Sequence, residues 1–214
     1  MPKFVANRIN GIYIITDGRY AGKDGHVTIA QAAVRAGTPC LQLRAPELSD
    51  RNLLEVAKEI AQLTRNTGTL FIVNNRVDIA LASGADGVHL GQDDMPCKDA
   101  RRILGPDAII GISVGTVDEA IEAQAEGTDY IAIGPIFPTL TKTDAGDAVG
   151  LEAITNVNRA VDLPVVAIGG ISLANIASVR SAGADSAAVI SAVSTAPDIE
   201  EAVRTLAERF TCQE

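Results

Sequence analysis

Tryptophan is absent from this chain of 214 residues, and aromatic side chains make up only 3% of it. Hydrophobic residues nevertheless reach 47%, so alanine, valine and isoleucine must supply the core, as they do in parallel barrels filled by branched side chains. The three cysteines, Cys40, Cys97 and Cys212, are widely spaced and include no C-x-x-C pair. This scarcity argues against disulfide bonds and against a zinc site.

Basic residues are also few. The 18 Lys and Arg residues face 27 Asp and Glu residues, and the formal net charge of −9 argues against nucleic acid or an anionic membrane as a partner. We find no apolar stretch of transmembrane length and no signal peptide, and we expect a cytoplasmic protein that acts on small molecules. A phosphorylated ligand would need a local cationic pocket. The oligomeric state stays open, a homo-oligomer included.

One local pattern recurs along the chain. A glycine that can end a helix in the left-handed conformation stands before a short continuous apolar run at Gly37, Gly84, Gly127 and Gly183. With similar apolar runs elsewhere, this pattern predicts strands near 11–16, 39–43, 69–73, 86–90, 108–112, 129–133, 164–168 and 185–190. Helical patterns lie near 27–36, 50–66, 75–83, 97–104, 116–126, 150–160, 172–182 and 197–210. This order predicts the α/β class and a single (β/α)8 TIM barrel over residues 1–214, with no room for a second domain.

In such a barrel, the active site lies at the carboxyl ends of the strands, whereas residues at the amino ends serve stability. Asp86, Asp129 and Asp185 each precede a predicted strand, so we assign them to the stability end. The opposite end collects Gln42, Arg44, Asn74, Asn75, His89, Gln92, Asp93, Asp94 and Ser113.

A long polar loop follows the apolar run that begins at Tyr130, and this loop extends to Gly150. Loops of this length are usually lids or binding loops. This loop carries three hydroxyl groups and one cation, which together suit an anion clamp: Thr139, Thr141, Thr143 and Lys142.

A second anion site is predicted where the last two strands end. The glycine pair Gly169-Gly170 lets the backbone come close to a ligand, and Ile190-Ser191 follows the eighth strand. Backbone N–H groups in such turns attract phosphate. The alternative is two ordinary turns, with Ser172 only capping the next helix.

Three polar positions have both a structural and a functional interpretation. Gln42 and Arg44 point to the same side of a strand end, and Arg44 is either a clamp for phosphate or carboxylate or the partner of Asp94 in a salt bridge. Asn75 suits the cap of the following helix, an explanation that Asn74 lacks.

Acidic residues and histidines leave similar alternatives. Asp93 and Asp94 either bind a magnesium ion beside substrate phosphates or cap the helix after Pro96. His89 alternates with apolar residues, which favours a hydrogen-bonded core position, and we expect His26 to be an ordinary polar residue at the surface near the first helix.

Seven segments resemble, in order, the motifs of thiamine phosphate synthases, and the resemblance spans nearly the whole chain. The segments are Tyr13-Ile-Ile-Thr-Asp17, Leu41-Gln-Leu-Arg44, Phe71-Ile-Val-Asn-Asn-Arg-Val-Asp-Ile-Ala-Leu81, Gly87-Val-His-Leu-Gly-Gln-Asp-Asp94, Gly134-Pro-Ile-Phe-Pro-Thr-Leu-Thr-Lys142, Ala167-Ile-Gly-Gly-Ile171 and Val189-Ile-Ser191. The lid segment ending at Lys142 is the most specific of them. The glycine-pair segment is shared with many barrels.

The resemblance implies a reaction that joins a hydroxymethylpyrimidine diphosphate to a thiazole phosphate and releases pyrophosphate, assisted by Mg²⁺. Gln42 and Arg44 would hold the pyrimidine diphosphate, with Asn74 beside its phosphates. Asp94 would be a magnesium ligand, and Ser113 would contact the pyrimidine.

The remaining implied roles concern the leaving group and the second substrate. Lys142 would neutralise the departing pyrophosphate, which makes Lys142, Arg44 and Ser113 the implied catalytic set. Thr139 and Thr141 would orient the thiazole phosphate. Its phosphate would rest on the backbone at Gly170, Ile190 and Ser191. Such chemistry is electrostatic and needs few titratable bases.

Two positions depart from the family pattern. Asn75 stands where the family usually has Asp as a second magnesium ligand, and Pro46 stands where it usually has Lys. Asn75 can still offer its carbonyl oxygen to the metal, without charge. The sequence leaves open a slower synthase or a relative that has lost the chemistry.

Two further functions also stay open. A thiazole tautomerase of the same fold would carry a histidine in the loop after the fifth strand, and Ile112-Ser-Val-Gly-Thr116 has none. A non-catalytic barrel could instead bind thiazole phosphate or thiamine phosphate.

Overall fold

Eight parallel strands close into a barrel in this computed structural model, which describes residues 8–18, 22–139 and 146–212. Each strand pairs with the next one in the chain, and β8 pairs with β1. The strands are β1 (Gly11–Ile15), β2 (Cys40–Leu43), β3 (Leu70–Asn74), β4 (Gly87–Leu90), β5 (Ile109–Val114), β6 (Tyr130–Ile133), β7 (Val165–Ile168) and β8 (Ser186–Val189). The predicted (β/α)8 barrel and its eight strands are confirmed.

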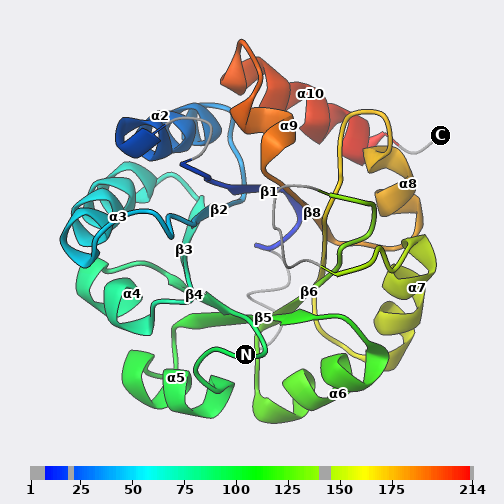
Figure 1. The fold of residues 1–214 in the computed structure, drawn as a ribbon. Helices are drawn as coiled ribbons and strands as arrows, with labels where there is room; N and C mark the ends of the chain where they lie inside the picture. The colour runs from blue at the N-terminus through cyan, green and yellow to red at the C-terminus, as the bar shows by residue number, and fades with distance from the viewer. Residues whose placement is uncertain (1–7, 19–21, 140–145, 213–214) are drawn as a thin grey trace.

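Helices form a ring around this barrel (Figure 1). They are α2 (Gly22–Arg35), α3 (Asp50–Thr64), α4 (Val77–Ser83), α5 (Cys97–Leu104), α6 (Val117–Glu126), α7 (Leu151–Ala160), α8 (Ile176–Ser181), α9 (Ser191–Ser194) and α10 (Ile199–Thr211). Among the described residues, no helix is both long enough and apolar enough to cross a membrane.

Some helix boundaries differ from the predicted ones. The first described helix, α2, begins five residues before the predicted start at residue 27, at Gly22. Helix α8 begins at Ile176, because the Asn175 side chain accepts a hydrogen bond from the Ser172 N–H (2.8 Å) and closes a turn there. Ser172 therefore does not cap α8. The one-turn helix α9 was not predicted.

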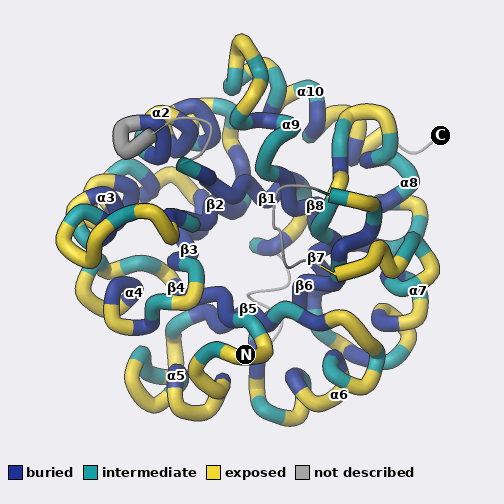
Figure 2. The backbone as a smooth tube through the Cα atoms, in the orientation of Figure 1, coloured by how far each residue is buried: buried dark blue, intermediate teal, exposed yellow. Residues whose placement is uncertain are grey.

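Alternating residues along each strand divide the apolar side chains into two sets. Outward residues such as Ile12 and Ile14 pack in the large cluster between strands and helices. Inward residues such as Tyr13 and Tyr130 form a second cluster inside the barrel. Figure 2 shows the result, with buried strands surrounded by helices whose outer surfaces are exposed.

Three aspartates fasten the amino ends of the strands. Asp86, Asp129 and Asp185 accept hydrogen bonds from the backbone N–H groups of Phe71, Ile110 and Val165, at 2.8, 2.8 and 2.9 Å. Each aspartate thus joins its own strand to the preceding one. Their predicted place at the stability end is confirmed.

Candidate active site

A cavity of about 430 Å³ opens at the carboxyl ends of the strands. Gln92 and Asp93, which were predicted at the same end, are not among the residues that line it, whereas ten other predicted site residues are. The ten are Gln42, Arg44, Asn74, Asn75, Asp94, Ser113, Thr139, Gly170, Ile190 and Ser191. Thr141, Thr143 and Lys142 fall outside the described residues. The structure brings the described set together; the individual roles stay predictions.

The predicted lid is attached to the barrel beside β7. The backbone N–H groups of Ile136 and Phe137 donate to the carbonyl oxygens of Ile168 (2.8 Å) and Gly169 (3.0 Å). On the returning side, the Val149 N–H donates to the Pro135 carbonyl oxygen at 2.8 Å. Both ends of the loop are therefore held at the cavity edge.

The attachment of the lid requires glycine at position 170. Gly170 has φ +64°, and a Cβ atom there would lie 2.7 Å from Cβ of Phe137 and 2.7 Å from the Pro138 carbonyl oxygen. A side chain would collide with the first residues of the lid. The glycine pair thus has a packing function here, besides leaving the backbone accessible.

Arg44 makes an ion pair with Asp17, at the end of β1. Its Nη1 atom lies 3.0 Å from Asp17 Oδ2, and the Asp17 side chain is only 2% exposed. The proposed salt bridge to Asp94 is absent: Asp94 Oδ2 instead accepts a hydrogen bond from the Gly91 N–H at 2.6 Å. Asp17 can hold Arg44 in one direction while the remaining guanidinium donors stay able to bind an anion.

His26 is fully buried, which corrects its assignment to the surface. Its Nδ1 atom lies 2.8 Å from Thr16 Oγ1 and its Nε2 atom lies 2.7 Å from Glu47 Oε1. Thr16 Oγ1 also accepts a hydrogen bond from the Arg44 backbone N–H at 3.3 Å. His26 thus supports the segment that carries Arg44, a contact between chain segments that the isolated sequence did not reveal.

The capping interpretations of Asn75, Asp93 and Asp94 are wrong. Arg76 is the N-cap of α4 and Pro96 is the N-cap of α5, and neither helix has a side-chain capping hydrogen bond. Asn75 is exposed at the cavity edge with φ +60°, a left-handed conformation in which Asn and Asp are enriched.

A chain of polar side chains crosses the floor of the cavity. Gln42 Nε2 lies 2.8 Å from the Tyr13 hydroxyl, which lies 2.8 Å from the Tyr130 hydroxyl. His89 follows, with Nδ1 at 3.0 Å from the Tyr130 hydroxyl and Nε2 at 2.9 Å from Ser113 Oγ. The prediction that His89 is a buried, hydrogen-bonded residue is confirmed, and it also lines the cavity.

Tyr13 and Tyr130 were missed as site residues. Both are buried, and burial raises the pKa of each hydroxyl well above its usual range, so both stay protonated. A sequence signal existed, because both occupy inward positions in their strands, in phase with Gln42 and Ser113. Their apolar neighbours made them resemble ordinary core residues.

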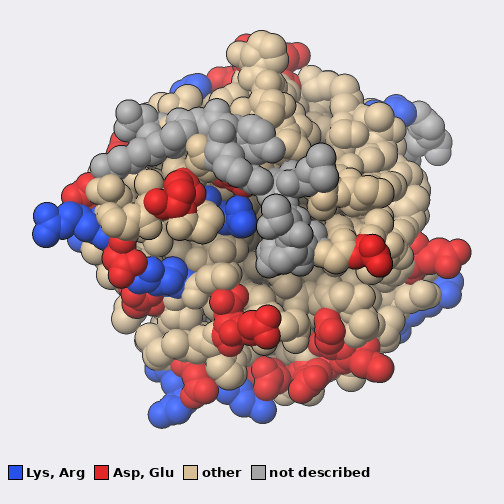
Figure 3. Space-filling model, viewed as in Figure 1, with Lys and Arg blue, Asp and Glu red and all other residues tan. Residues whose placement is uncertain are grey.

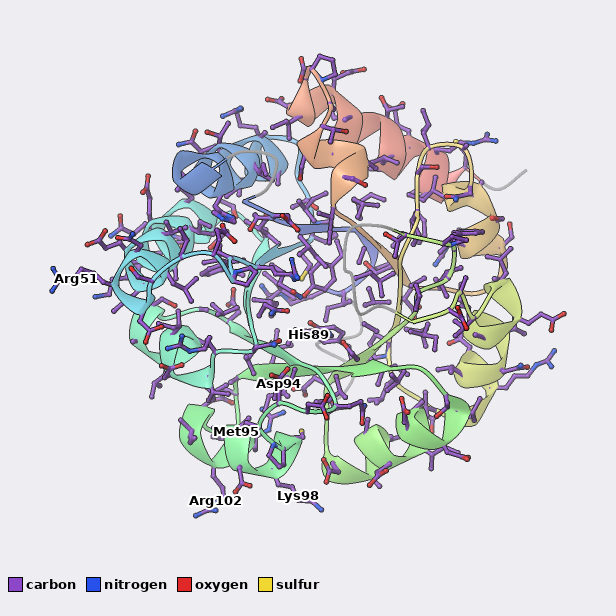
Figure 4. All side chains as sticks on the ribbon, in the orientation of Figure 1. Arg51, His89, Asp94, Met95, Lys98 and Arg102 are labelled. Atoms are coloured by element: carbon purple, nitrogen blue, oxygen red, sulfur yellow. The ribbon has the colours of Figure 1, made fainter. Side chains whose placement is uncertain are left out.

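The charge around the cavity is unevenly distributed. In the space-filling view, acidic side chains gather over the segments that lead into α5 and α6 (Figure 3). His89 and Asp94 lie toward the centre of the mouth, whereas Arg51, Lys98 and Arg102 lie at the outer ring (Figure 4). Among the described residues that line the cavity, Arg44 is the cation and Asp94 the carboxylate.

Fold and cavity together define a (β/α)8 barrel with a small-molecule site at the carboxyl ends of its strands. Residues 12–193 match the family model described as thiamine monophosphate synthase. The chain belongs to this family of transferases.

Individual relatives agree with the family match. The thiamine-phosphate synthase of Methanoregula boonei is 50% identical over 200 residues, covering 94% of this chain and 93% of its own. That of Roseiflexus castenholzii is 49% identical, covering 92% and 86%. A solved structure of thiamine phosphate pyrophosphorylase from Pyrococcus furiosus is 39% identical, with a TM-score of 0.87 and coverage of 96% and 97%.

Thiamine phosphate synthases need a metal ion. The described residues contain no cluster of three or more His, Cys, Asp or Glu side chains that could hold one. The cavity does offer the Asp94 carboxylate and the amide oxygens of Asn74 and Asn75. Such a sparse oxygen set fits a hard cation that keeps several waters and shares substrate phosphates.

Proposed function

We propose that this chain condenses hydroxymethylpyrimidine diphosphate with thiazole phosphate to give thiamine phosphate and pyrophosphate, with Mg²⁺ as the metal ion. The observation that carries the proposal is the gathering of ten predicted residues around one cavity, in a chain that belongs to the synthase family. We further propose that the enzyme is one domain and works in the cytoplasm.

The closed barrel supports a division of the cavity between the two substrates. Gln42, Arg44, Asn74 and Asp94 come from β2 to β4 or the loops that follow, whereas Thr139, Gly170, Ile190 and Ser191 come from the ends of β6 to β8. These strands lie on opposite sides of the barrel (Figure 1). The first wall would bind the pyrimidine diphosphate and the second the thiazole phosphate.

Pyrophosphate departure requires positive charge where negative charge develops. Arg44, held by Asp17, would bind the diphosphate through guanidinium donors that the ion pair leaves available. Lys142, for which the family resemblance is the support, would neutralise the leaving group. Ser113 would contact the pyrimidine.

Asp94 and Asn75 would hold Mg²⁺ together with diphosphate oxygens and water. When bound, Mg²⁺ supplies positive charge to the departing pyrophosphate. Hydrogen bonding to the Gly91 N–H fixes the direction of the Asp94 carboxylate. With Pro46 at the cavity edge in place of a cation, the metal must carry a larger share of the charge neutralisation.

Two measurements test this function. Purified protein with both substrates and Mg²⁺ should release pyrophosphate in an amount equal to the thiamine phosphate formed, and omission of either substrate should abolish release. Expression should restore growth without thiamine in cells that lack their own synthase. Soluble, folded protein that fails both measurements would leave a binding function and exclude the synthase.

A further inference from the structure

The hydrogen-bond chain across the cavity floor has a direction. The Gln42 amide nitrogen donates to the Tyr13 hydroxyl oxygen, so the proton of Tyr13 must be given elsewhere. Cys40 is also a hydrogen-bond partner of Tyr13, but sulfur is the weaker acceptor, so we take the Tyr13 hydroxyl to donate to the Tyr130 hydroxyl, 2.8 Å away. The Tyr130 proton then goes to His89 Nδ1, at 3.0 Å.

This direction sets the tautomer of His89. Because Nδ1 accepts, a neutral imidazole carries its hydrogen on Nε2 and donates it to Ser113 Oγ at 2.9 Å. Ser113, having accepted this bond, has its own proton to give to a ligand. At the other end, the Gln42 amide nitrogen gives one of its two N–H groups to Tyr13, and the amide oxygen is able to accept a hydrogen bond from a ligand.

The barrel is shaped to hold this chain. The His89 and Tyr130 rings are stacked with centroids 5.5 Å apart. A Cβ atom on Gly111 would lie 2.0 Å from the Tyr130 ring, so Gly111 provides the space that the ring occupies. Both tyrosines stay protonated because burial raises their pKa values. Each hydroxyl can therefore accept one hydrogen bond and donate another.

We propose that Tyr13, Tyr130 and His89 are positioning residues that fix the hydrogen-bond polarity of the cavity, with an acceptor at Gln42 and a donor at Ser113. The two polarities are linked, because reversing any one bond reverses the others. The three positioning residues thus determine which pattern of hydrogen-bond donors and acceptors on the edge of a heteroaromatic ring fits the cavity.

The consequence for the ligand rests on the proposed function. The pyrimidine of that substrate carries an amino group, which donates, and ring nitrogens, which accept. An acceptor on one wall and a donor on the other complement this pattern. An analogue with an oxo group in place of the amino group presents an acceptor to an acceptor, and the intact chain should select against it.

NMR spectroscopy of the imidazole nitrogens tests the direction without using activity. The sequence has two histidines, so only the signals of His89 remain in the His26→Gln variant. If that variant does not fold, the signals that disappear in His89→Gln are those of His89. A hydrogen bonded to Nε2 with a bare Nδ1 is expected. A hydrogen on Nδ1, with or without one on Nε2, overturns the proposal.

Kinetics test the positioning role. Tyr13→Phe releases the Gln42 amide to turn either way, so the ratio of kcat/KM for the amino and oxo pyrimidine diphosphates should fall about two- to tenfold, the size of one neutral hydrogen bond. Tyr130→Phe should act in the same sense and replaces Tyr13→Phe if the latter does not fold. An unchanged ratio in a folded variant overturns the role.

Thr128→Val is the matched control. Thr128 is buried and its hydroxyl donates to the Ile110 carbonyl oxygen at 2.7 Å, at the amino ends of the strands. Its loss should lower the Tm and leave the substrate ratio unchanged; a ratio that falls as far as in Tyr13→Phe overturns the positioning role. If unsubstituted protein releases no pyrophosphate, the proposed function fails, and the imidazole spectrum still decides the direction of the chain.

Discussion

At the amino ends of the strands, Asp86, Asp129 and Asp185 each accept a hydrogen bond from the backbone of the preceding strand. At the carboxyl ends, Asp94 and Asn75 line a cavity instead. The three aspartates at one end thus bind the backbone of a neighbouring strand, whereas Asp94 at the other end accepts a local hydrogen bond from the Gly91 N–H and also lines the cavity. Substitutions at the two ends should therefore separate stability from activity.

The largest effect is expected at the lid. Lys142→Ala should lower kcat by about 10²–10³-fold, on the order of 2.7–4 kcal/mol, because charge develops on the leaving group in the transition state. Thiazole phosphate binding should change less. Pyrophosphate release at saturating substrate measures this, with the exposed Lys98→Ala on α5 as the control. An unchanged kcat would remove Lys142 from the mechanism.

A smaller, selective effect is expected at the base of the lid. Gly170→Ala combines left-handed strain of about 1–2 kcal/mol with a collision against Phe137. The KM for thiazole phosphate should rise about tenfold, with little change in the KM for the pyrimidine diphosphate.

Gly84→Ala controls for backbone strain in that experiment. Gly84 has φ +73°, and a Cβ atom there meets nothing within 4 Å. This variant should lose stability by a similar strain energy and keep both KM values. If Gly170→Ala raises both KM values equally, the lid attachment does not explain the defect.

The opposite end of the barrel should show the reverse pattern. Asp129→Ala removes the acceptor for the Ile110 N–H and for Arg101, at 2.8 and 2.6 Å. The loss should be about 1–3 kcal/mol of unfolding free energy, with a Tm lower by about 2–4 °C for each kcal/mol. Thermal melts measure this, and the exposed Asp107→Ala is the control. A fall in kcat without a fall in Tm would contradict the division between the ends.

The smallest effect concerns the metal. Asn75→Asp adds a carboxylate at the cavity edge, so half-maximal pyrophosphate release should need about two- to fivefold less Mg²⁺, the size of a charge pair near the surface. Asn66→Asp is the control, because Asn66 is also exposed with a similar φ of +64°. No shift in Asn75→Asp would leave Asp94 and the substrate oxygens as the metal site.

Much of the cavity was predictable because neighbouring residues determine it. A strand end and its alternation place Gln42 and Arg44 toward the barrel mouth whatever the rest of the chain does. The interpretation of Asn75 and Ser172 as helix caps was wrong because helix starts depend on competing local bonds, such as the bond from the Ser172 N–H to Asn175. Such bonds form only at particular backbone angles, and residue type favours those angles without fixing them.

Sequence alone determined three things: the eight strands, the family, and the end of the barrel at which the site lies. It could do so because each βα unit is formed by a contiguous stretch of chain. Closure of the barrel decided which inward side chains meet. Tyr13 and Tyr130 are 117 residues apart in sequence, yet their hydroxyl groups lie 2.8 Å apart. Alternation fixes the face on which a residue lies, but a hydrogen bond depends on distances of about 3 Å, and those exist only once all eight strands are in register.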